Sequence, residues 1–220
     1  MYKKSVVALV AALLAMAAGT ASADVVCADS SYCTVTFTRT YTGNFNPGQP
    51  YDYVTIAPDG TGETFAQFGI TIRVFLKNCQ GQPLVGVPAQ QINLFNANLC
   101  ICPGGAISDA GTDANGMATF SGSIRAGGCA QSVDVYADGV FICTLRSSPG
   151  NVSVKINSPD NAQQGTSPCF TDADDLVIMA SRLGRPAFYN ICQDFNESGG
   201  PTLDSSDLAY FAAVLGASCN

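Results

Sequence analysis

The sequence DFNESGGPTLDSSDLAYFAAVL, from Asp194 to Leu215, decides the organisation of the C-terminal part of the chain. Its second half has apolar residues at positions i, i+3, i+4 and i+7, namely Leu208, Phe211, Ala212 and Leu215. This spacing predicts an amphipathic helix with one apolar face. Gly216 is a candidate C-cap for that helix, because glycine readily adopts the left-handed conformation that ends many helices.

The first half of this stretch carries oxygen-bearing side chains at alternate positions. Asp194, Asn196 and Ser198 are followed by a glycine, in the pattern of positions 1, 3, 5 and 6 of a calcium-binding loop. At the start of the predicted helix, Asp207 is expected to close the coordination shell, and Asp204 is a further candidate ligand. Because Ca²⁺ takes oxygen ligands, these residues predict a calcium site.

The same pattern occurs once earlier in the chain, at an offset of 32 residues. Asp172, Asp175, Leu176, Met179, Ala180, Leu183 and Gly184 correspond in order to Asp204, Asp207, Leu208, Phe211, Ala212, Leu215 and Gly216. Asp160 is the upstream acidic residue of the earlier copy, so Asp160, Asp172 and Asp175 are the candidate ligands of a first calcium site. The duplication predicts a pseudo-twofold pair of loop–helix units, since neither helix could bury its apolar face alone.

Paired loop–helix calcium repeats at the C-terminus of an exported bacterial protein resemble a dockerin domain, here over roughly residues 158–220. The resemblance implies a small α-helical, EF-hand-like module that binds calcium and docks to a cohesin on another protein. It also implies that residues just before the last ligand of each loop recognise the partner. These residues are Ala173 and Asp174 in the first repeat and Ser205 and Ser206 in the second.

The two loops depart from the dockerin pattern in length. Asp207 lies 13 positions after Asp194, whereas the first and last ligands of a twelve-residue loop are 11 apart, and Gly200-Pro201 marks the extra length. The first loop is longer still and has fewer oxygen-bearing side chains. An alternative interpretation is that one or both loops are Asp/Asn turns, held without metal by local hydrogen bonds and cysteines.

Residues 1–23 have the pattern of a signal peptide. Lys3 and Lys4 precede an apolar run from Val6 to Ala18, and Ala21-Ser22-Ala23 is a small-residue cleavage site. The apolar run is short for a membrane span. The sequence therefore predicts bacterial export of residues 24–220 to the extracellular space or the cell surface, with no membrane span after cleavage.

The predicted exported chain is acidic. Removing Lys3 and Lys4 from the 10 basic residues leaves 8 against 17 acidic residues, a net charge of −9. From residue 158 onward, 8 acidic residues stand against only Arg182 and Arg185. This charge disfavours nucleic acid and anionic membranes as partners and suits cation binding.

All ten cysteines lie in the predicted exported chain, which favours disulfides over thiol chemistry. Their spacing suggests a Cys27–Cys33 bridge and a Cys192–Cys219 bridge around the second loop–helix unit. If Cys27 pairs with Cys33, five cysteines remain in the middle region and three in the last. With every cysteine paired, at least one bridge must then connect the two regions.

Residues 24–157 predict an all-strand region. The clearest period-two alternation is Phe68, Ile70, Ile72, Val74 and Leu76. Further strands are predicted around residues 34–38, 92–94, 118–124, 133–135, 140–145 and 152–156. Residues 41–63 predict a long surface connection, and 126–128 a turn. Seven or eight short strands predict a β-sandwich.

Two motifs of this region, GQPLVGVP at residues 81–88 and TDANGMATF at 112–120, resemble the immunoglobulin-like domains of invasin-type bacterial adhesins. The resemblance covers roughly residues 66–157. Asn115-Gly116 suits a tight turn that needs positive φ angles. The predicted fold class is therefore mainly β: an immunoglobulin-like β-sandwich at residues 24–157, followed by the small helical module at 158–220.

The composition excludes several kinds of active site. The chain has no His, so it cannot form a Ser-His-Asp or Cys-His nucleophile system. Asp109, Asp113, Asp134 and Asp138 lie in or beside turn signals, which predicts structural roles for these carboxylates.

These observations predict a secreted, non-enzymatic scaffold or adhesion protein that docks to a cohesin or another cell-surface protein through a calcium-loaded module. One alternative is a structural cell-surface protein whose helical cap is disulfide-bonded and metal-free. The other is a carbohydrate-binding module that contacts a polysaccharide through Tyr41, Phe45, Tyr51 and Tyr53.

Overall fold

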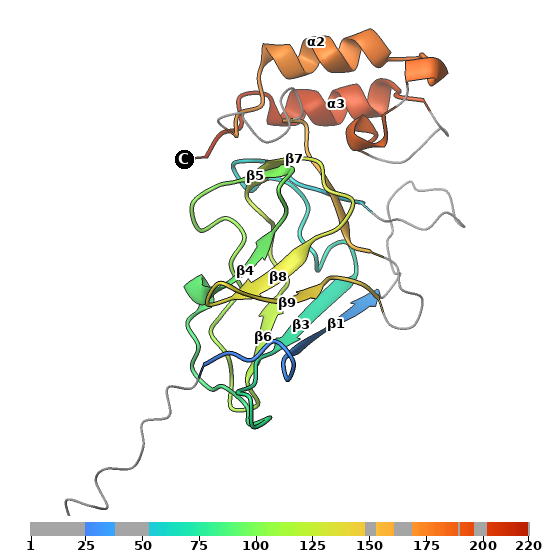
Figure 1. The fold of residues 1–220 in the computed structure, drawn as a ribbon. Coiled ribbons are helices and arrows are strands. Elements are labelled where there is room, and N and C mark those ends of the chain that lie inside the picture. The colour runs from blue at the N-terminus through green and yellow to red at the C-terminus, as the bar shows by residue number, and fades with distance from the viewer. Residues whose placement is uncertain are drawn as a thin grey trace, which may run out of the picture.

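A computed structural model of the chain describes residues 25–37, 53–147, 153–160, 169–188, 190–195 and 202–219. The predicted signal peptide lies outside these residues. A β-rich body carries a pair of helices at one end (Figure 1), which confirms the prediction of a mainly β fold. In the part of the chain described, no helix is both long and apolar enough to cross a membrane.

Two three-stranded antiparallel sheets make up most of the body. In the first sheet, β3 lies between β1 and β6; in the second, β8 lies between β4 and β9. The strands of the first are β1 (Tyr32–Phe37), β3 (Ile70–Phe75) and β6 (Met117–Phe120). Those of the second are β4 (Ile92–Phe95), β8 (Asp134–Ala137) and β9 (Val140–Thr144).

Besides the two α-helices, the other described elements are two strand pairs and three 3-10 helices. An antiparallel pair joins β5 (Leu99–Ile101) to β7 (Ala126–Gly128), and a parallel pair joins β2 (Tyr53–Thr55) to β10 (Lys155–Asn157). The 3-10 helices are η1 (Ala89–Gln91), η2 (Pro186–Phe188) and η3 (Ile191–Gln193).

One apolar core is shared by the sheets of the body. The alternation in β3 buries Ile70, Ile72 and Val74, as predicted. Ile72 pairs with Val35 on one side and with Phe120 on the other, so a buried row crosses the whole sheet. Burial of such a row is the main source of stability in a sheet-based domain.

Three segments differ from the sequence-based predictions. Ala126–Gly128, predicted as a turn, forms strand β7, and its partner β5 has no clear alternation because it has only three residues. Tyr53–Thr55, predicted within a surface connection, forms the buried strand β2. These short strands are specified by their partners from distant parts of the chain, which local patterns do not reveal.

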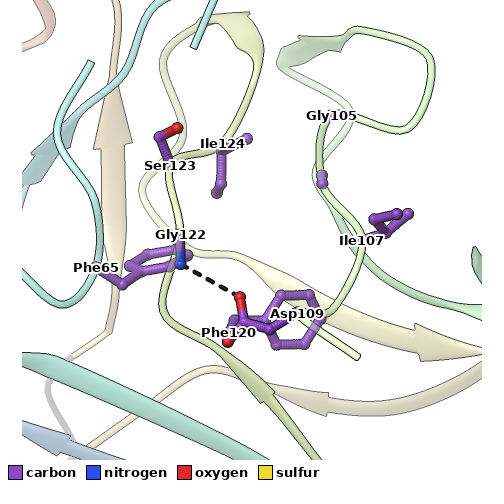
Figure 2. A pocket seen from close by; sticks show the side chains of 9 residues that line it. Phe65, Gly105, Ile107, Asp109, Phe120, Gly122, Ser123 and Ile124 are labelled. Carbon is purple, nitrogen blue, oxygen red and sulfur yellow. Dashed lines mark hydrogen bonds between the residues drawn. The ribbon is translucent and has the colours of Figure 1, made fainter. Parts of the chain in front are cut away.

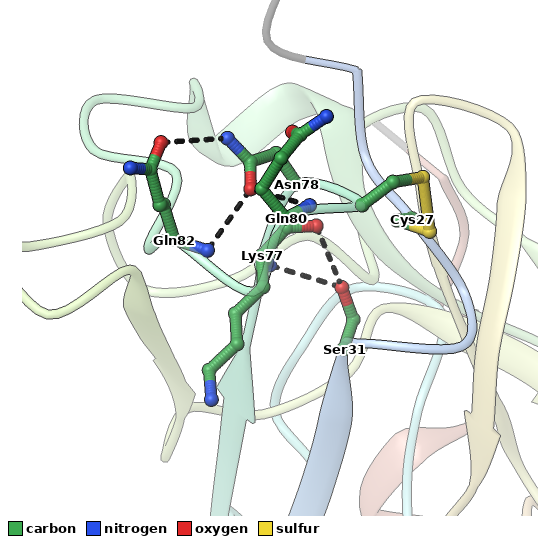
Figure 3. The surroundings of a disulfide bond; sticks show 7 residues. Cys27, Ser31, Lys77, Asn78, Gln80 and Gln82 are labelled. Atoms are coloured by element: carbon green, nitrogen blue, oxygen red, sulfur yellow. Dashed lines mark hydrogen bonds between the residues drawn. A yellow bond between two sulfur atoms is a disulfide. The ribbon is translucent and has the colours of Figure 1, made fainter.

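All ten cysteines form disulfides, which confirms disulfide bonding but not the suggested pairs. Cys27 bonds to Cys79 and Cys33 to Cys143, so the suggested Cys27–Cys33 bridge is wrong. Around the Cys27–Cys79 bridge (Figure 3), the Ser31 hydroxyl contacts both the N–H and the carbonyl of Lys77, which ties the start of β1 to the end of β3.

Three bridges connect the body to the helical end. They are Cys100–Cys169, Cys102–Cys219 and Cys129–Cys192. The suggested Cys192–Cys219 bridge is therefore wrong, while the expected connection between the two regions is present three times over.

The two α-helices repeat each other at the offset of 32 residues. They are α2 (Ala173–Arg182) and α3 (Ser205–Val214). The Gly216 N–H donates to the Thr171 carbonyl, and the Gly184 N–H donates to the Leu203 carbonyl. Shifting the residue numbers by 32 converts each of these bonds into the other, as expected for a pseudo-twofold pair. Each bond joins the C-terminal end of one helix to the segment before the other helix, so the two helices are antiparallel.

The buried face of α3 differs from the predicted one. Asp207, Phe211 and Val214 are buried, whereas Leu215 is 52% exposed and Ala212 is exposed. The reason is that α3 has neighbours on two sides (Figure 1): Phe211 packs with Met179 of α2, and Val214 packs with Ala57 of the body. A helix between two layers buries a wider arc than one apolar stripe.

We expect the Cys102–Cys219 bridge to hold α3 on the body, because it is the one covalent connection on the C-terminal side of that helix. Its residues are 117 apart, so the double substitution Cys102→Ser/Cys219→Ser should lower the free energy of unfolding by about 4 kcal/mol. Hydrogen exchange should accelerate across α3. The matched control, Cys27→Ser/Cys79→Ser, should destabilise the chain without a selective effect on α3; equal protection of α3 in both variants would contradict this role.

Candidate functional site

Both α-helices begin with the same pair of aspartates. Asp172 and Asp204 are N-caps, whose carboxylates accept the N–H groups of Asp174 and Ser206 at 2.8 and 2.7 Å. Three residues on, Asp175 and Asp207 accept the N–H groups of the two N-cap residues at 3.0 and 2.9 Å. These capping boxes satisfy N–H groups of the first turn that have no partner within the helix. These four aspartates, all predicted calcium ligands, therefore also cap the N-terminal ends of the helices.

Asp160 lies with Asp175 in the first of the two acidic sites. Both side chains are almost fully buried, with 3% and 2% of their surface exposed. The Phe170 N–H donates to the Asp160 carboxylate, but Asp160 Oδ2 is buried without a hydrogen-bond partner among the described residues. A buried carboxylate oxygen of this kind costs free energy unless a proton or a cation compensates it.

The electrostatics of Asp160 follow from this position. Burial raises the pKa of Asp160 to about 6, and the Asp175 carboxylate, followed by that of Asp172, acts in the same direction. The hydrogen bond from the Phe170 N–H opposes the shift. The first site therefore gathers negative charge that the surrounding protein does not fully neutralise.

Asp194 and Asp207 form the corresponding second site. Their side chains are 2% and 0% exposed, and Asp207 Oδ1 accepts the N–H of Phe195, one residue after Asp194, at 2.8 Å. The structure thus places Asp207, the last predicted ligand of this loop, against the backbone that directly follows Asp194, the first. Asn196 and Ser198, the other two predicted ligands, lie outside the described residues.

Two residues of the body form hydrogen bonds to the start of the second loop. The Asn157 Nδ2 donates to the Asp194 carbonyl at 3.1 Å, and the Thr55 hydroxyl donates to the Phe195 carbonyl at 3.1 Å. Both body residues are buried. Asn157 and Thr55 come from different strands and belong to no sequence motif, so the sequence does not predict that they meet at this loop.

The chemistry of the two sites is that of oxygen ligands. The carboxylates of Asp160, Asp175, Asp194 and Asp207 are buried, and carboxylate oxygens are ligands that a hard divalent cation such as Ca²⁺ takes. Among the described residues, the one group of three such side chains close enough to share a metal ion is Cys102, Cys169 and Cys219, whose sulfur atoms lie within 4.8 Å of one another. The predicted ligands Asp160, Asp172 and Asp175 are described but do not form such a group. All three sulfurs are in disulfides, so they offer no thiolate to a metal.

The predicted partner-binding residues are on the surface. Ala173, Asp174, Ser205 and Ser206 are all exposed in the first turns of the two helices. Because the helices are antiparallel, the two pairs lie at opposite ends of the helix pair.

The other predicted sites are less well suited to function. Tyr53 is buried and its hydroxyl donates to Gln131, so it cannot stack on a sugar, while Tyr41, Phe45 and Tyr51 lie outside the described residues. A pocket of about 50 Å³ (Figure 2) has Asp109 among its lining residues. That carboxylate accepts the N–H groups of Ser121 and Gly122 and the Thr119 hydroxyl, which matches the predicted structural role.

Asp113 also acts as a turn residue. Its carboxylate accepts the N–H groups of Met117 and Asn115, which lower its pKa in that order of importance. Asp113 and Asp109 therefore brace the loops of the body.

Comparison with models of known protein families, with curated proteins and with solved structures gives no match for this chain.

We expect Asp160→Asn to stabilise the metal-free protein at pH 7 by about 1 kcal/mol, because the amide removes the buried charge. The pKa of Asp160 is raised in the folded state, so its carboxyl group binds a proton more tightly there than in the unfolded chain. Its contribution to the free energy of unfolding is therefore fully present below about pH 4 and is lost as the pH rises through about 6. Urea unfolding of chelator-treated protein between pH 4 and pH 7.5 measures the difference between variant and wild type. The exposed control, Asp174→Asn, should lack this dependence; a constant Asp160→Asn effect across the range would refute the assignment.

Proposed function

We propose that this chain is an exported, non-enzymatic docking protein, in which an immunoglobulin-like body carries a dockerin-like pair of calcium loops. The observation on which the calcium proposal depends is the buried Oδ2 of Asp160, on a carboxyl group whose pKa is raised by burial and by the negative charge of Asp175. A divalent cation there would supply the compensation that the described protein groups do not. Asp194 and Asp207 are the buried aspartates of the second unit.

The strand orders support an immunoglobulin-like body. An immunoglobulin domain of the constant type places strands A, B and E in one sheet and C, F and G in the other. Taken in chain order, β1, β3 and β6 correspond to A, B and E, and β4, β8 and β9 to C, F and G. The parallel bridge between Val35 and Ser147, like the Cys33–Cys143 disulfide, connects β1 to β9 and the segment that follows it.

Five disulfides support export. Disulfides persist in oxidising compartments, and a chain with every cysteine paired suits the extracellular space or cell surface. The N-terminal signal pattern points to the same destination.

A second function, a metal-free structural cap, also has specific support. The capping boxes give both Asp175 and Asp207 backbone hydrogen bonds, and three disulfides connect the helical end to the body without any cation. Under this alternative, calcium would leave the stability unchanged.

Calorimetric titration of Ca²⁺ into chelator-treated mature protein separates the two functions. We expect two equivalents to bind and the melting temperature to rise, because the cation binds only the folded state. Asp160→Asn should remove one equivalent, whereas Asp174→Asn, which changes the same charge at an exposed position, should keep both. Absence of heat and of any melting shift at millimolar Ca²⁺ would favour the structural cap.

Docking should use the exposed first turns of the helices. With a recombinant cohesin-type domain as the probe, we expect Ser205→Arg/Ser206→Arg to weaken calcium-dependent binding by about 30-fold or more, as for substitution at the centre of an interface. Val177→Arg is the matched control, because Val177 is 66% exposed in the middle of α2. Surface plasmon resonance measures both. Equal loss in the two variants would place the contact elsewhere on the helix pair.

A further inference from the structure

The strand pair β5–β7 contacts Asp160 of the first acidic site. The Gly128 N–H donates to the Asp160 carbonyl at 2.7 Å. A Cβ atom on Gly127 would collide with the Asp160 carboxylate and would lie 2.6 Å from its Cγ. The Asp160 side chain therefore lies directly against the backbone of β7, where only glycine leaves it room.

The same strand pair anchors all three bridges to the helical end. Cys100 is within β5 and Cys102 directly follows it, while Cys129 directly follows β7. Cys100 pairs in register with Gly127, so the Cys100–Cys169 bridge starts beside the glycine that contacts Asp160. Cys169 in turn precedes Phe170, whose N–H donates to the Asp160 carboxylate.

We propose that the body builds part of the first cation site: Gly127 and the β5–β7 pair position the Asp160 carboxylate, so a cation binds at Asp160 and Asp175 only when the helical end is bridged to the body. This inference rests on the proposed calcium function. Gly127 acts through Asp160 and is a positioning residue. The second site has a different support, namely the hydrogen bonds from Asn157 and Thr55 to the Asp194 and Phe195 carbonyls, so the two sites can be separated experimentally.

Gly127→Ala in the full mature chain tests the proposal. We expect Ca²⁺ titration to show one equivalent where the wild type shows two, with the affinity of the remaining site unchanged within about twofold. Gly122→Ala is the matched control, because a Cβ there meets only Asp109 Oδ1, at an ordinary 3.7 Å. The control should keep both equivalents.

Two further variants distinguish positioning from a general loss of stability. If Gly127 acts through Asp160, the double variant Gly127→Ala/Asp160→Asn should bind Ca²⁺ like either single variant. Should Gly127→Ala not fold, Cys100→Ser/Cys169→Ser keeps the glycine but releases the clamp, and we expect the first-site affinity to fall at least about tenfold, as when supporting residues of a metal site are lost.

These measurements distinguish a failure of the proposed role of Gly127 from a failure of calcium binding itself. Two equivalents in the wild type and two of unchanged affinity in Gly127→Ala would overturn the role of the body while leaving calcium binding in place. Loss of both sites in Gly127→Ala with a folded chain would also overturn it, since the effect would not be specific to Asp160. No binding by the wild type would remove the proposed function and this inference together.

Discussion

The burial of carboxylates at the junction between the body and the helix pair is the constraint on which the C-terminal architecture depends. Asp175 and Asp207 lie in the first turns of helices, where the exposed N–H groups and the helix dipole favour negative charge. Asp160 has no helix of its own and lies against β7, with one oxygen lacking a hydrogen-bond partner among the described residues. The two units are therefore related in backbone but differ in the body residues that contact their upstream aspartate, which are Gly127 and Gly128 for Asp160 and Asn157 for Asp194.

The disulfides convert this junction into a fixed geometry. A pair of ten-residue helices has too little apolar surface for an independent core, and small exported units commonly compensate with covalent bridges. Here all three bridges leave from the β5–β7 region and reach the segments before the first helix, before the second loop and after the last helix. Restricting the loop ends in this way lowers the conformational entropy lost when a ligand is bound.

This arrangement also divides the surface of the helix pair. The inner side of α3 is covered by the body, through Val214 against Ala57 and the Tyr210 hydroxyl at 3.5 Å from the Thr55 carbonyl. The first turns of both helices stay exposed at opposite ends. The pseudo-twofold relation therefore presents two similar exposed surfaces, one at each end of the helix pair.

Much of the fold follows from local sequence, because its signals are local. The alternation at Ile70, Ile72 and Val74 predicts β3, and the duplicated Asp–x–x–Asp pattern predicts two helices at the observed offset, since capping boxes and apolar periodicity act within a few residues. The pairing of Asp160 with the first helix also follows from the duplication. Local sequence does not predict the strand β7, the exposure of Leu215 or the partners of the disulfide bridges.

What the sequence determined by itself is the mainly β composition, the repeated loop–helix unit and the acidic residues that each unit carries. Only the tertiary structure decided which cysteines pair, which side of α3 is buried and that Gly127 lies under Asp160. Those features join residues tens of positions apart, such as Cys102 with Cys219. A residue pattern reflects the periodicity of the helix or strand that contains it. Contacts between distant residues depend instead on how the formed helices and strands pack together.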